Sequence, residues 1–255
     1  MWYSFWSYIT FIFSATNQHG VHSPFVYNLV TKCFYDNTEY NGYSRLINYK
    51  KQLQRNNTFI SITDLGPGSK KTNTTKRQVS EIAKTSGSSL KRSKLLFRLL
   101  NYFKPQQVLE LGTSLGIATH AMALGNPETT ITSIEGCPNL SSFANQQLKD
   151  LKNISFLTGD FKTHISQLKS QHYDLIFFDG NHTKEATLHY FNALLPTTNN
   201  DSIFIFDDIY WSKGMTEAWK IIQQHPKVTV TIDTYYWGFV FFRKEQAKEH
   251  FKIRL

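Results

Sequence analysis

The sequence predicts an α/β fold built on a seven-stranded, mostly parallel sheet that ends in an antiparallel hairpin. From Gln106 onward, short β-rich runs alternate with helix-like segments, which is the pattern of strand-helix-strand units. The last two β-rich runs, VTVTIDT and FVFFR, are separated only by YYWG, which is too short for a crossover helix. These two strands are therefore expected to pair antiparallel.

Hydrophobic patterning places the individual elements. Strands are expected at 107–111, 130–135, 154–159, 173–179, 202–208, 228–234 and 239–243. Helices are expected between them, near 116–125, 138–152, 162–169, 183–194 and 213–224. Pro138 suits a first helical turn, and Pro196 and Pro226 suit the exits from helices.

The N-terminal part, residues 1–85, is expected to be a helical, basic extension, and residues 86–255 the main domain. Apolar residues at helical spacing between Leu95 and Phe103 predict an amphipathic helix that leads into the first strand. Residues 1–13 are aromatic and uncharged, too short to cross a membrane, and lack the features of a signal peptide. They are interpreted as a helix docked on the domain, with a lid or dimer element and an interfacial membrane anchor as alternatives.

Charge and cysteine content narrow the class of protein. The net charge is +9, and residues 1–105 alone carry 15 basic and 4 acidic residues, a net of +11. Such a basic region attracts nucleic acid, lipid headgroups or phosphorylated substrates, and charge does not choose among them. The two cysteines, Cys33 and Cys137, suggest neither a disulfide framework nor a cysteine-based zinc site, and a cytoplasmic setting fits best.

Two glycine-bearing stretches compete as a cofactor loop. One spans 108–124 and has two glycines in a turn after a β-rich run, followed by an alanine-rich helical segment. The other spans 62–71, contains Pro67 and continues into a polar run without apolar periodicity, which indicates a surface loop. The first of these stretches is therefore the better candidate.

Within that stretch, ELGTSLG resembles the E-x-G-x-x-x-G loop of class I S-adenosylmethionine-dependent methyltransferases, and the likeness runs from about Leu90 to Arg243. It implies a Rossmann-like sheet with S-adenosylmethionine as cofactor. The resemblance places Glu110 near the methionine ammonium, Glu135 at the ribose hydroxyls and Asp160 at the adenine amino group. The cofactor-binding residues that it implies are Glu110, Gly112, Thr113, Ser114, Gly116, Glu135, Gly136, Asp160, Phe161 and Asp179.

Acidic residues also follow the fourth and fifth expected strands. Asp179, Asp207 and Asp208 should converge as three carboxylates, the hard oxygen ligands that Mg²⁺ prefers. The pattern resembles cation-dependent catechol and sugar O-methyltransferases. His182 stands where the catechol enzymes have a catalytic lysine, and Asp208 where they have asparagine.

His182 and Asp179 are the expected catalytic residues, because an imidazole can act as a base near neutrality. The alternative is that His182 caps the helix beginning at Thr183 and that the aspartates form turns.

The sequence favours O-methylation of a hydroxylated small molecule, assisted by Mg²⁺ or another divalent cation. It has no Asn/Asp-Pro-Pro-Tyr/Phe motif for amino-group methylation, and no Pro-Cys pair follows the fourth strand. The alternatives are an RNA methyltransferase that uses the basic region around Lys70, Lys71, Lys76 and Arg77, and a non-catalytic cofactor-binding or membrane-associated protein.

Overall fold

The computed structural model describes residues 2–63, 76–86 and 88–255, which form two compact units. Unit 1 comprises residues 1–31 and 165–255, and unit 2 comprises residues 32–164. The loop expected around Gly66, Pro67 and Gly68 lies outside the described residues. The boundary expected after residue 85 stays a prediction.

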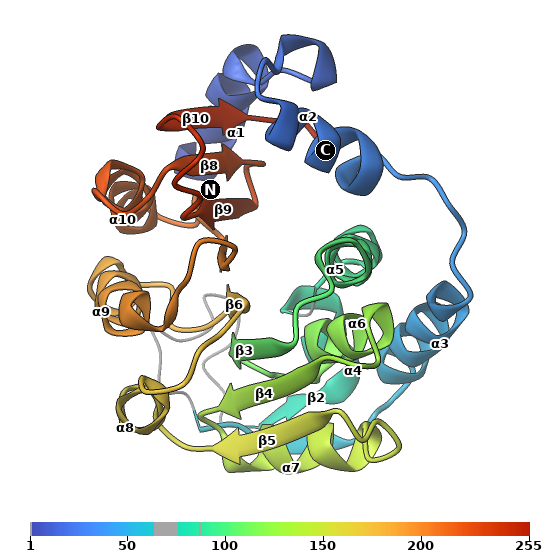
Figure 1. Cartoon of the computed structure of the whole chain (residues 1–255). Coiled ribbons are helices and arrows are strands. Elements are labelled where there is room, and N and C mark those ends of the chain that lie inside the picture. Colours follow the sequence, from blue (N-terminus) through green and yellow to red (C-terminus); the bar gives the residue numbers. More distant parts are fainter. Residues whose placement is uncertain (1, 64–75, 87) are drawn as a thin grey trace. The chain divides into compact units, whose positions relative to one another are not determined.

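Three parallel strands form the sheet of unit 2 (Figure 1). Their order is β3-β4-β5, with bounds Gln107–Leu111, Thr130–Glu135 and Ile154–Thr158. The helices that follow or precede them are α5 (Leu90–Phe103), α6 (Ile117–Gly125), α7 (Pro138–Gln147) and α8 (Phe161–Leu168). Glu110 pairs with Ser133, and Glu135 pairs with Thr158, so these strands end side by side.

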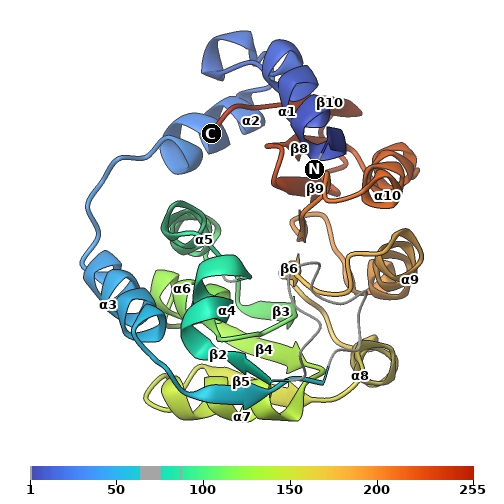
Figure 2. The same cartoon turned by 180° about the vertical axis from the view of Figure 1, so that it is seen from behind.

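The remaining elements of unit 2 pack over α6 and α7 (Figure 2). They are α3 (Gly42–Gln54), α4 (Val79–Thr85) and an antiparallel pair, β1 (Phe59–Ser61) with β2 (Lys76–Gln78). The buried cluster that joins them contains Tyr49, Leu53, Ile60, Val79, Ile82, Ile117 and Leu140. The sequence did not predict the β1–β2 pair, because each strand has three residues and β2 is polar.

Unit 1 holds five strands in the order β10-β8-β9-β7-β6. Their bounds are β6 (Leu175–Phe178), β7 (Ile203–Asp207), β8 (Val230–Asp233), β9 (Trp237–Phe241) and β10 (Glu249–Lys252). β6 and β7 are parallel, and β9 runs antiparallel to both β7 and β8. The helices α9 (Lys184–Leu194) and α10 (Lys213–Gln224) connect them.

The α/β, mostly parallel fold expected from the sequence is confirmed, including its antiparallel hairpin. Every one of the seven expected strands is present within about two residues of its expected bounds. One further strand, β10, pairs in parallel with β8. Its sequence EHFK buries only Phe251, and this is too little apolar signal for a strand to be predicted.

The N-terminal helix α1 (Trp2–Ser14) packs through one face on the C-terminal part of unit 1. Phe11 and Ala15 are buried against Tyr235, and Thr16 N donates to the Lys252 carbonyl at 2.8 Å. After α2 (Pro24–Leu29) the chain passes into unit 2. Within the described residues, no helix combines the length and apolar character needed to cross a membrane.

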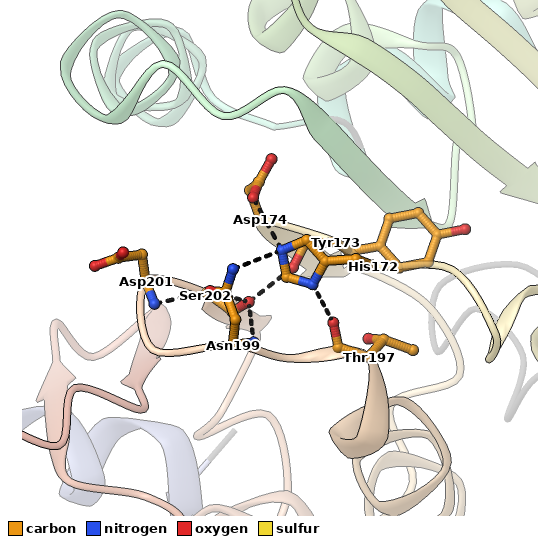
Figure 3. Close-up of polar contacts among 7 residues, drawn as sticks. All are labelled: His172, Tyr173, Asp174, Thr197, Asn199, Asp201 and Ser202. Atoms are coloured by element: carbon orange, nitrogen blue, oxygen red, sulfur yellow. Dashed lines mark hydrogen bonds and ion pairs between the residues drawn. The ribbon is translucent and has the colours of Figure 1, made fainter.

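A polar network fixes the amino ends of β6 and β7 (Figure 3). The ring of His172 bonds the Thr197 carbonyl through Nδ1 at 2.7 Å and approaches Asp174 and Asn199 through Nε2. Ser202 Oγ donates to the Tyr173 carbonyl at 2.8 Å. These bonds join the residues before β6 to those before β7, so that the two strands start, and therefore end, at matching positions.

Candidate active site

The glycine loop between β3 and α6 has an unusual backbone. Gly112, Ser114 and Gly116 all have positive φ, at +109°, +50° and +72°. A Cβ atom on Gly116 would lie 2.9 Å from Leu148 Cδ1, so the leucine side chain would have to shift, and the positive φ disfavours any side chain at this position. The loop therefore presents backbone groups at the start of α6, as the sequence predicted.

Glu110 lies near the end of β3, two residues before Gly112, and is fully buried. Its Oε2 atom accepts hydrogen bonds from Thr119 Oγ1 and Ser133 Oγ, each at 2.5 Å. The Oε1 atom is buried and has no hydrogen-bond partner among the described residues. Burial raises the pKa of Glu110 to about 7, against the lowering effect of the Ser133 and Thr119 hydroxyls.

Glu135, at the end of β4, accepts hydrogen bonds from backbone N–H groups of the glycine loop and of the turn that follows β4. Ser114 N donates to Oε2 at 2.7 Å and Cys137 N donates to Oε1 at 2.9 Å. Burial raises the pKa of this carboxyl, while the N–H groups of Cys137, Ser114, Thr113 and Gly136 act in the opposite direction. Each carboxylate oxygen has two lone pairs, so acceptor capacity remains for ligand hydroxyls.

Asp160 lies at the end of β5 and is exposed. Its Oδ1 accepts from the Thr163 backbone N–H at 3.1 Å. Asp160 thereby caps the N-terminus of helix α8, which begins at Phe161. This capping contact leaves the other carboxylate oxygen available, and the adenine contact expected for Asp160 remains a prediction.

Sequence reasoning missed Tyr49, which supports the glycine loop from α3. Its hydroxyl donates to the Leu115 carbonyl at 2.6 Å, and its ring meets the His120 ring edge to face at 4.6 Å. No motif marks Tyr49, since it reads as one more buried aromatic residue of an amphipathic helix. The local sequence therefore held no signal that would have identified it.

The residues of unit 2 fit S-adenosylmethionine. The cofactor carries an ammonium and a sulfonium, both cationic, and the unpartnered buried oxygen of Glu110 is an acceptor that a cationic donor would satisfy. The N-terminus of α6 and the loop amides suit a carboxylate. Glu110 lies near the end of β3, Glu135 ends β4 and Asp160 follows β5, and these three strands are neighbours in the sheet; their joint role at the cofactor stays a prediction.

In unit 1, three side chains could hold a metal ion. One ligand atom from each of Asp179, His182 and Asp207 lies within 4.8 Å of the others. Asp207 is 7% exposed, and its Oδ1 accepts from the buried Trp237 Nε1 at 2.6 Å. The pairing of Phe178 with Phe206 brings Asp179 and Asp207 to the same level of the sheet. Two carboxylates with an imidazole fit a divalent cation.

His182 does not cap the following helix, which was the simpler alternative. The N-cap of α9 is Thr183, whose side chain accepts from Ala186 N at 3.3 Å. His182 Nε2 instead lies 3.7 Å from Asp179 Oδ1. The imidazole is thus directed to the carboxylate that ends β6.

The structure differs from the expected ligand set at Asp208. The group that could hold an ion contains His182 in its place, and Asp208 lines a pocket with Tyr210 and Tyr235. Successive side chains of a strand point to opposite faces, and the left-handed backbone of Asp208, with φ of +54°, adds a sharp turn after Asp207. Asp207 therefore lies in the group that could hold an ion, whereas Asp208 lines the pocket.

A known family is similar to the part of the chain that carries these residues. Residues 109–209 match the family model described as a methyltransferase domain. The match begins within β3 and ends just after Asp208, so it includes both the glycine loop and the Asp179 group. The match agrees with the methyltransferase resemblance of ELGTSLG.

Solved structures show the same fold. The SAH-bound methyltransferase of Podospora anserina aligns with a TM-score of 0.59 at 13% identity, covering 88% of this chain and 97% of its own. The O-methyltransferase of Bacillus cereus in complex with SAH gives 0.56 at 14%, covering 80% and 92%. TomG of Streptomyces achromogenes, an O-methyltransferase of tomaymycin synthesis in complex with SAM, gives 0.57 at 13%, covering 81% and 91%. The chain shares its fold with these three methyltransferases.

Replacing Glu110 by Gln should change how stability depends on pH. The folded-state pKa of about 7 lies above the ordinary value of 4.5, so the stabilising effect of the neutral carboxyl is complete below pH 4.5 and lost as the pH rises through 7. Between these limits the wild type should lose up to about 3 kcal/mol of unfolding free energy relative to Glu110→Gln. Urea unfolding of both ligand-free proteins across this range measures the difference, and parallel curves would contradict it.

Proposed function

We propose that this protein transfers a methyl group from S-adenosylmethionine to a hydroxyl group of a small molecule, with a divalent cation held by Asp179 and Asp207. The observation that carries the proposal is the Asp179, His182 and Asp207 group inside a methyltransferase domain. A hydroxyl acceptor has to lose a proton, which a base accepts, and a cation that binds the hydroxyl oxygen would lower its pKa.

The cofactor would be held by unit 2. Glu110 would accept from its ammonium, and Glu135 from its ribose hydroxyls. The amides from Gly112 to Gly116 would face its carboxylate, while Asp160 and Phe161 would lie at the adenine. Support comes from the buried oxygen of Glu110 and from the neighbours of the same fold that contain SAM or SAH. The contact expected between Asp179 and the cofactor belongs to the same proposal.

When bound, a divalent cation would lower the pKa of an acceptor hydroxyl. Asp179 and Asp207 supply the anionic oxygens for it, and the hydrogen bond from Trp237 fixes one Asp207 oxygen. His182 is the weaker ligand for a hard cation such as Mg²⁺. We therefore assign His182 to proton transfer rather than to the cation.

His182 would accept the hydroxyl proton as the bond from methyl carbon to sulfur breaks and the bond from carbon to oxygen forms. Asp179, 3.7 Å from Nε2, would stabilise the imidazolium that results. S-adenosylhomocysteine and the methylated acceptor are the products, and the proton leaves through His182.

An acceptor screen with and without EDTA tests the proposal as a whole. Methyl transfer to hydroxylated small molecules that depends on added Mg²⁺ is the expected outcome. Methyl transfer to RNA instead, with binding that weakens steeply as salt is added, would favour the alternative acceptor suggested by the basic region.

Replacing Glu135 by Ala should weaken S-adenosylmethionine binding by about 1.5–3 kcal/mol, the range for hydrogen bonds to a charged group. Calorimetric titration measures the affinity. Glu128→Ala is the matched control, because Glu128 is an exposed glutamate in the turn before β4. Equal affinity of the Glu135 variant and this control would remove Glu135 from the cofactor site.

Changes at Asp179 and His182 should have different consequences. His182→Ala should retain cation affinity and lose about 10²–10⁴-fold in turnover, the usual contribution of a positioned base. Asp179→Asn should raise the Mg²⁺ concentration needed for half-maximal rate, with partial rescue by excess cation. Initial rates against Mg²⁺ and pH distinguish the two, with His189→Ala on the exposed side of α9 as control. Loss of cation affinity in His182→Ala would make His182 a ligand instead.

We also propose that α1 contacts a lipid surface. Trp2, Phe5, Trp6 and Phe13 are 57–87% exposed and fall on one side of the helix, opposite the buried Phe11. Large aromatic side chains on an amphipathic helix favour the membrane interface.

The double variant Trp2→Ser, Trp6→Ser should sediment with phosphatidylcholine–phosphatidylserine vesicles several-fold less than the wild type, because it loses both exposed indoles. The control is Ile221→Ser, which removes an exposed apolar side chain from α10. Vesicle binding that is absent from the wild type, or unchanged in the double variant, would contradict the proposal.

A further inference from the structure

A pocket of about 370 Å³ opens in unit 1 at the amino end of β7. Its lining residues come from three loops: 198–200 before β7, 226–229 before β8, and 242–244 after β9. These loops meet because the last residue of β9 pairs with the first residues of both β7 and β8. The register of the sheet therefore fixes where the pocket lies.

The pocket lies at the opposite end of β7 from Asp207. β7 runs from Ile203 to Asp207, and a strand rises about 3.3 Å per residue, so about 13 Å of strand separates the two ends. A ligand in the pocket would thus be a second ligand, separate from the acceptor hydroxyl that the proposed function places at the Asp179 group. Its binding does not depend on the proposed function.

Hydrogen bonds hold the loop before β7 in place (Figure 3). Asn199 Nδ2 lies 2.8 Å from His172 Nε2. Asn200 Oδ1 accepts from the Lys244 backbone N–H at 2.9 Å, and Asn200 Nδ2 donates to Glu245 Oε2 at 3.0 Å. Two walls of the pocket are therefore tied together, and the side-chain amide groups of both asparagines are engaged within the protein.

The lining of the pocket is positively charged. It contains two lysines, Lys227 and Lys244, and no acidic residue. The acids next to lining residues in the sequence, Asp201 and Glu245, are paired with Arg243 at 3.0 and 2.7 Å. Among the described residues, no acidic side chain forms an ion pair with Lys227 or Lys244. The charges of these two ammonium groups therefore face the pocket without an acid of the protein to neutralise them.

His225, two residues before Lys227, indicates the same positive potential. Burial lowers the pKa of its imidazole, and the ammonium groups of Lys227 and Lys248 lower it further. Lys248 Nζ also donates to the His225 carbonyl at 2.9 Å. Lys248 thus adds a third positive charge beside the loop before β8.

The other lining side chains leave hydrogen bonding to the lysines. The hydroxyls of Thr198 and Thr229 each donate to a backbone carbonyl. Phe242 is buried, and its ring packs edge to face on Phe204, with centroids 5.1 Å apart. Each ammonium group carries three N–H donors. Among the side chains that line the pocket, the lysines are therefore the donors for a ligand.

We propose that this pocket binds a phosphate group, either as free phosphate or as a small phosphate monoester. A phosphate dianion matches the two lysines in charge, and lysine binds phosphate as a point charge. A cationic ligand would be repelled by both ammonium groups. The volume lies within the usual range of small-molecule sites, which leaves room for the organic part of a monoester.

NMR titration of the full chain at pH 8 tests the charge preference with phenyl phosphate and benzenesulfonate. Both probes carry a tetrahedral anion on a phenyl ring, but the phosphate has two charges at this pH and the sulfonate has one. At constant ionic strength the wild type should bind phenyl phosphate about fivefold more tightly, which corresponds to about 1 kcal/mol. Equal affinities, or no binding of phenyl phosphate at tens of millimolar, would overturn the proposal.

Inorganic phosphate is the third probe, and it distinguishes the two sources of the phosphate group. Tighter binding of phenyl phosphate than of inorganic phosphate would assign the pocket to a monoester. Tighter binding of inorganic phosphate would assign it to the free ion. Both results support a phosphate site, provided that the lysine variants below weaken the binding.

The variants Lys227→Gln and Lys244→Gln locate the site. Each should weaken phenyl phosphate about fivefold and benzenesulfonate less, because each removes one of the two charges that face the dianion. Lys220→Gln is the matched control, since it removes the same charge from an exposed position of α10. Unchanged affinity in both pocket variants, or an equal loss in Lys220→Gln, would contradict the proposal. Thermal unfolding verifies that each variant is folded.

The outcomes separate the pocket from the reaction. Phosphate binding that depends on Lys227 and Lys244, in a protein that methylates no hydroxyl, would retain the pocket and reject the proposed function. Methylation of hydroxylated acceptors, together with equal affinities for phenyl phosphate and benzenesulfonate, would retain the function and reject the pocket.

Discussion

Parallel strand register is the constraint on which the acidic groups of each unit depend. Strands that pair in parallel without a shift end at the same edge, so residues that follow different strands become neighbours. In unit 2 the pairing of Glu135 with Thr158 sets the ends of β4 and β5 together. In unit 1 the pairing of Phe178 with Phe206 does the same for Asp179 and Asp207. The polar network around His172 sets this register from the opposite end.

The same arrangement places carboxylates where burying their charge costs free energy. β6 and β7 are buried along their whole length, and Asp207, which ends β7, is itself only 7% exposed, so little water reaches its charge. Hydrogen-bond donors offset the cost of burying these carboxylates: Trp237 donates to Asp207, and backbone amides donate to Glu135. Glu110 is compensated on one oxygen only. Bound cations would relieve this cost, which is a physical reason for acidic strand ends to favour cationic ligands.

The sequence was a good guide wherever a signal was local. The alternation of strands and helices, the glycine loop and the acids at the strand ends could all be predicted, because each depends on residues adjacent in the chain. The role of Tyr49 could not be, since the contact with Leu115 joins residues 66 apart. The group that could hold an ion contains His182 in place of Asp208, because Asp208 has a left-handed backbone conformation. This conformation could not be predicted from the fact that the residue is an aspartate. β10 was missed because its stability comes from pairing with β8 and from one buried side chain, Phe251.

Backbone strain gives an independent indication of where function lies. Among the described residues, the non-glycine positions with positive φ are Lys104, Ser114, Asn181, Asp208 and Tyr235. Lys104 follows the end of α5, where a left-handed residue is ordinary. The others lie in the glycine loop, beside His182, and in the pocket that Asp208 and Tyr235 line. A conformation that costs free energy persists only when its surroundings determine it. The surroundings differ at each of these places: the carboxylate of Glu135 accepts from Ser114, Tyr190 accepts from the Asn181 side chain, and Asp233 accepts from Tyr235. Three separate sets of contacts thus hold Ser114, Asn181 and Tyr235, and the first two of these turns carry groups that we assign to the cofactor and to proton transfer.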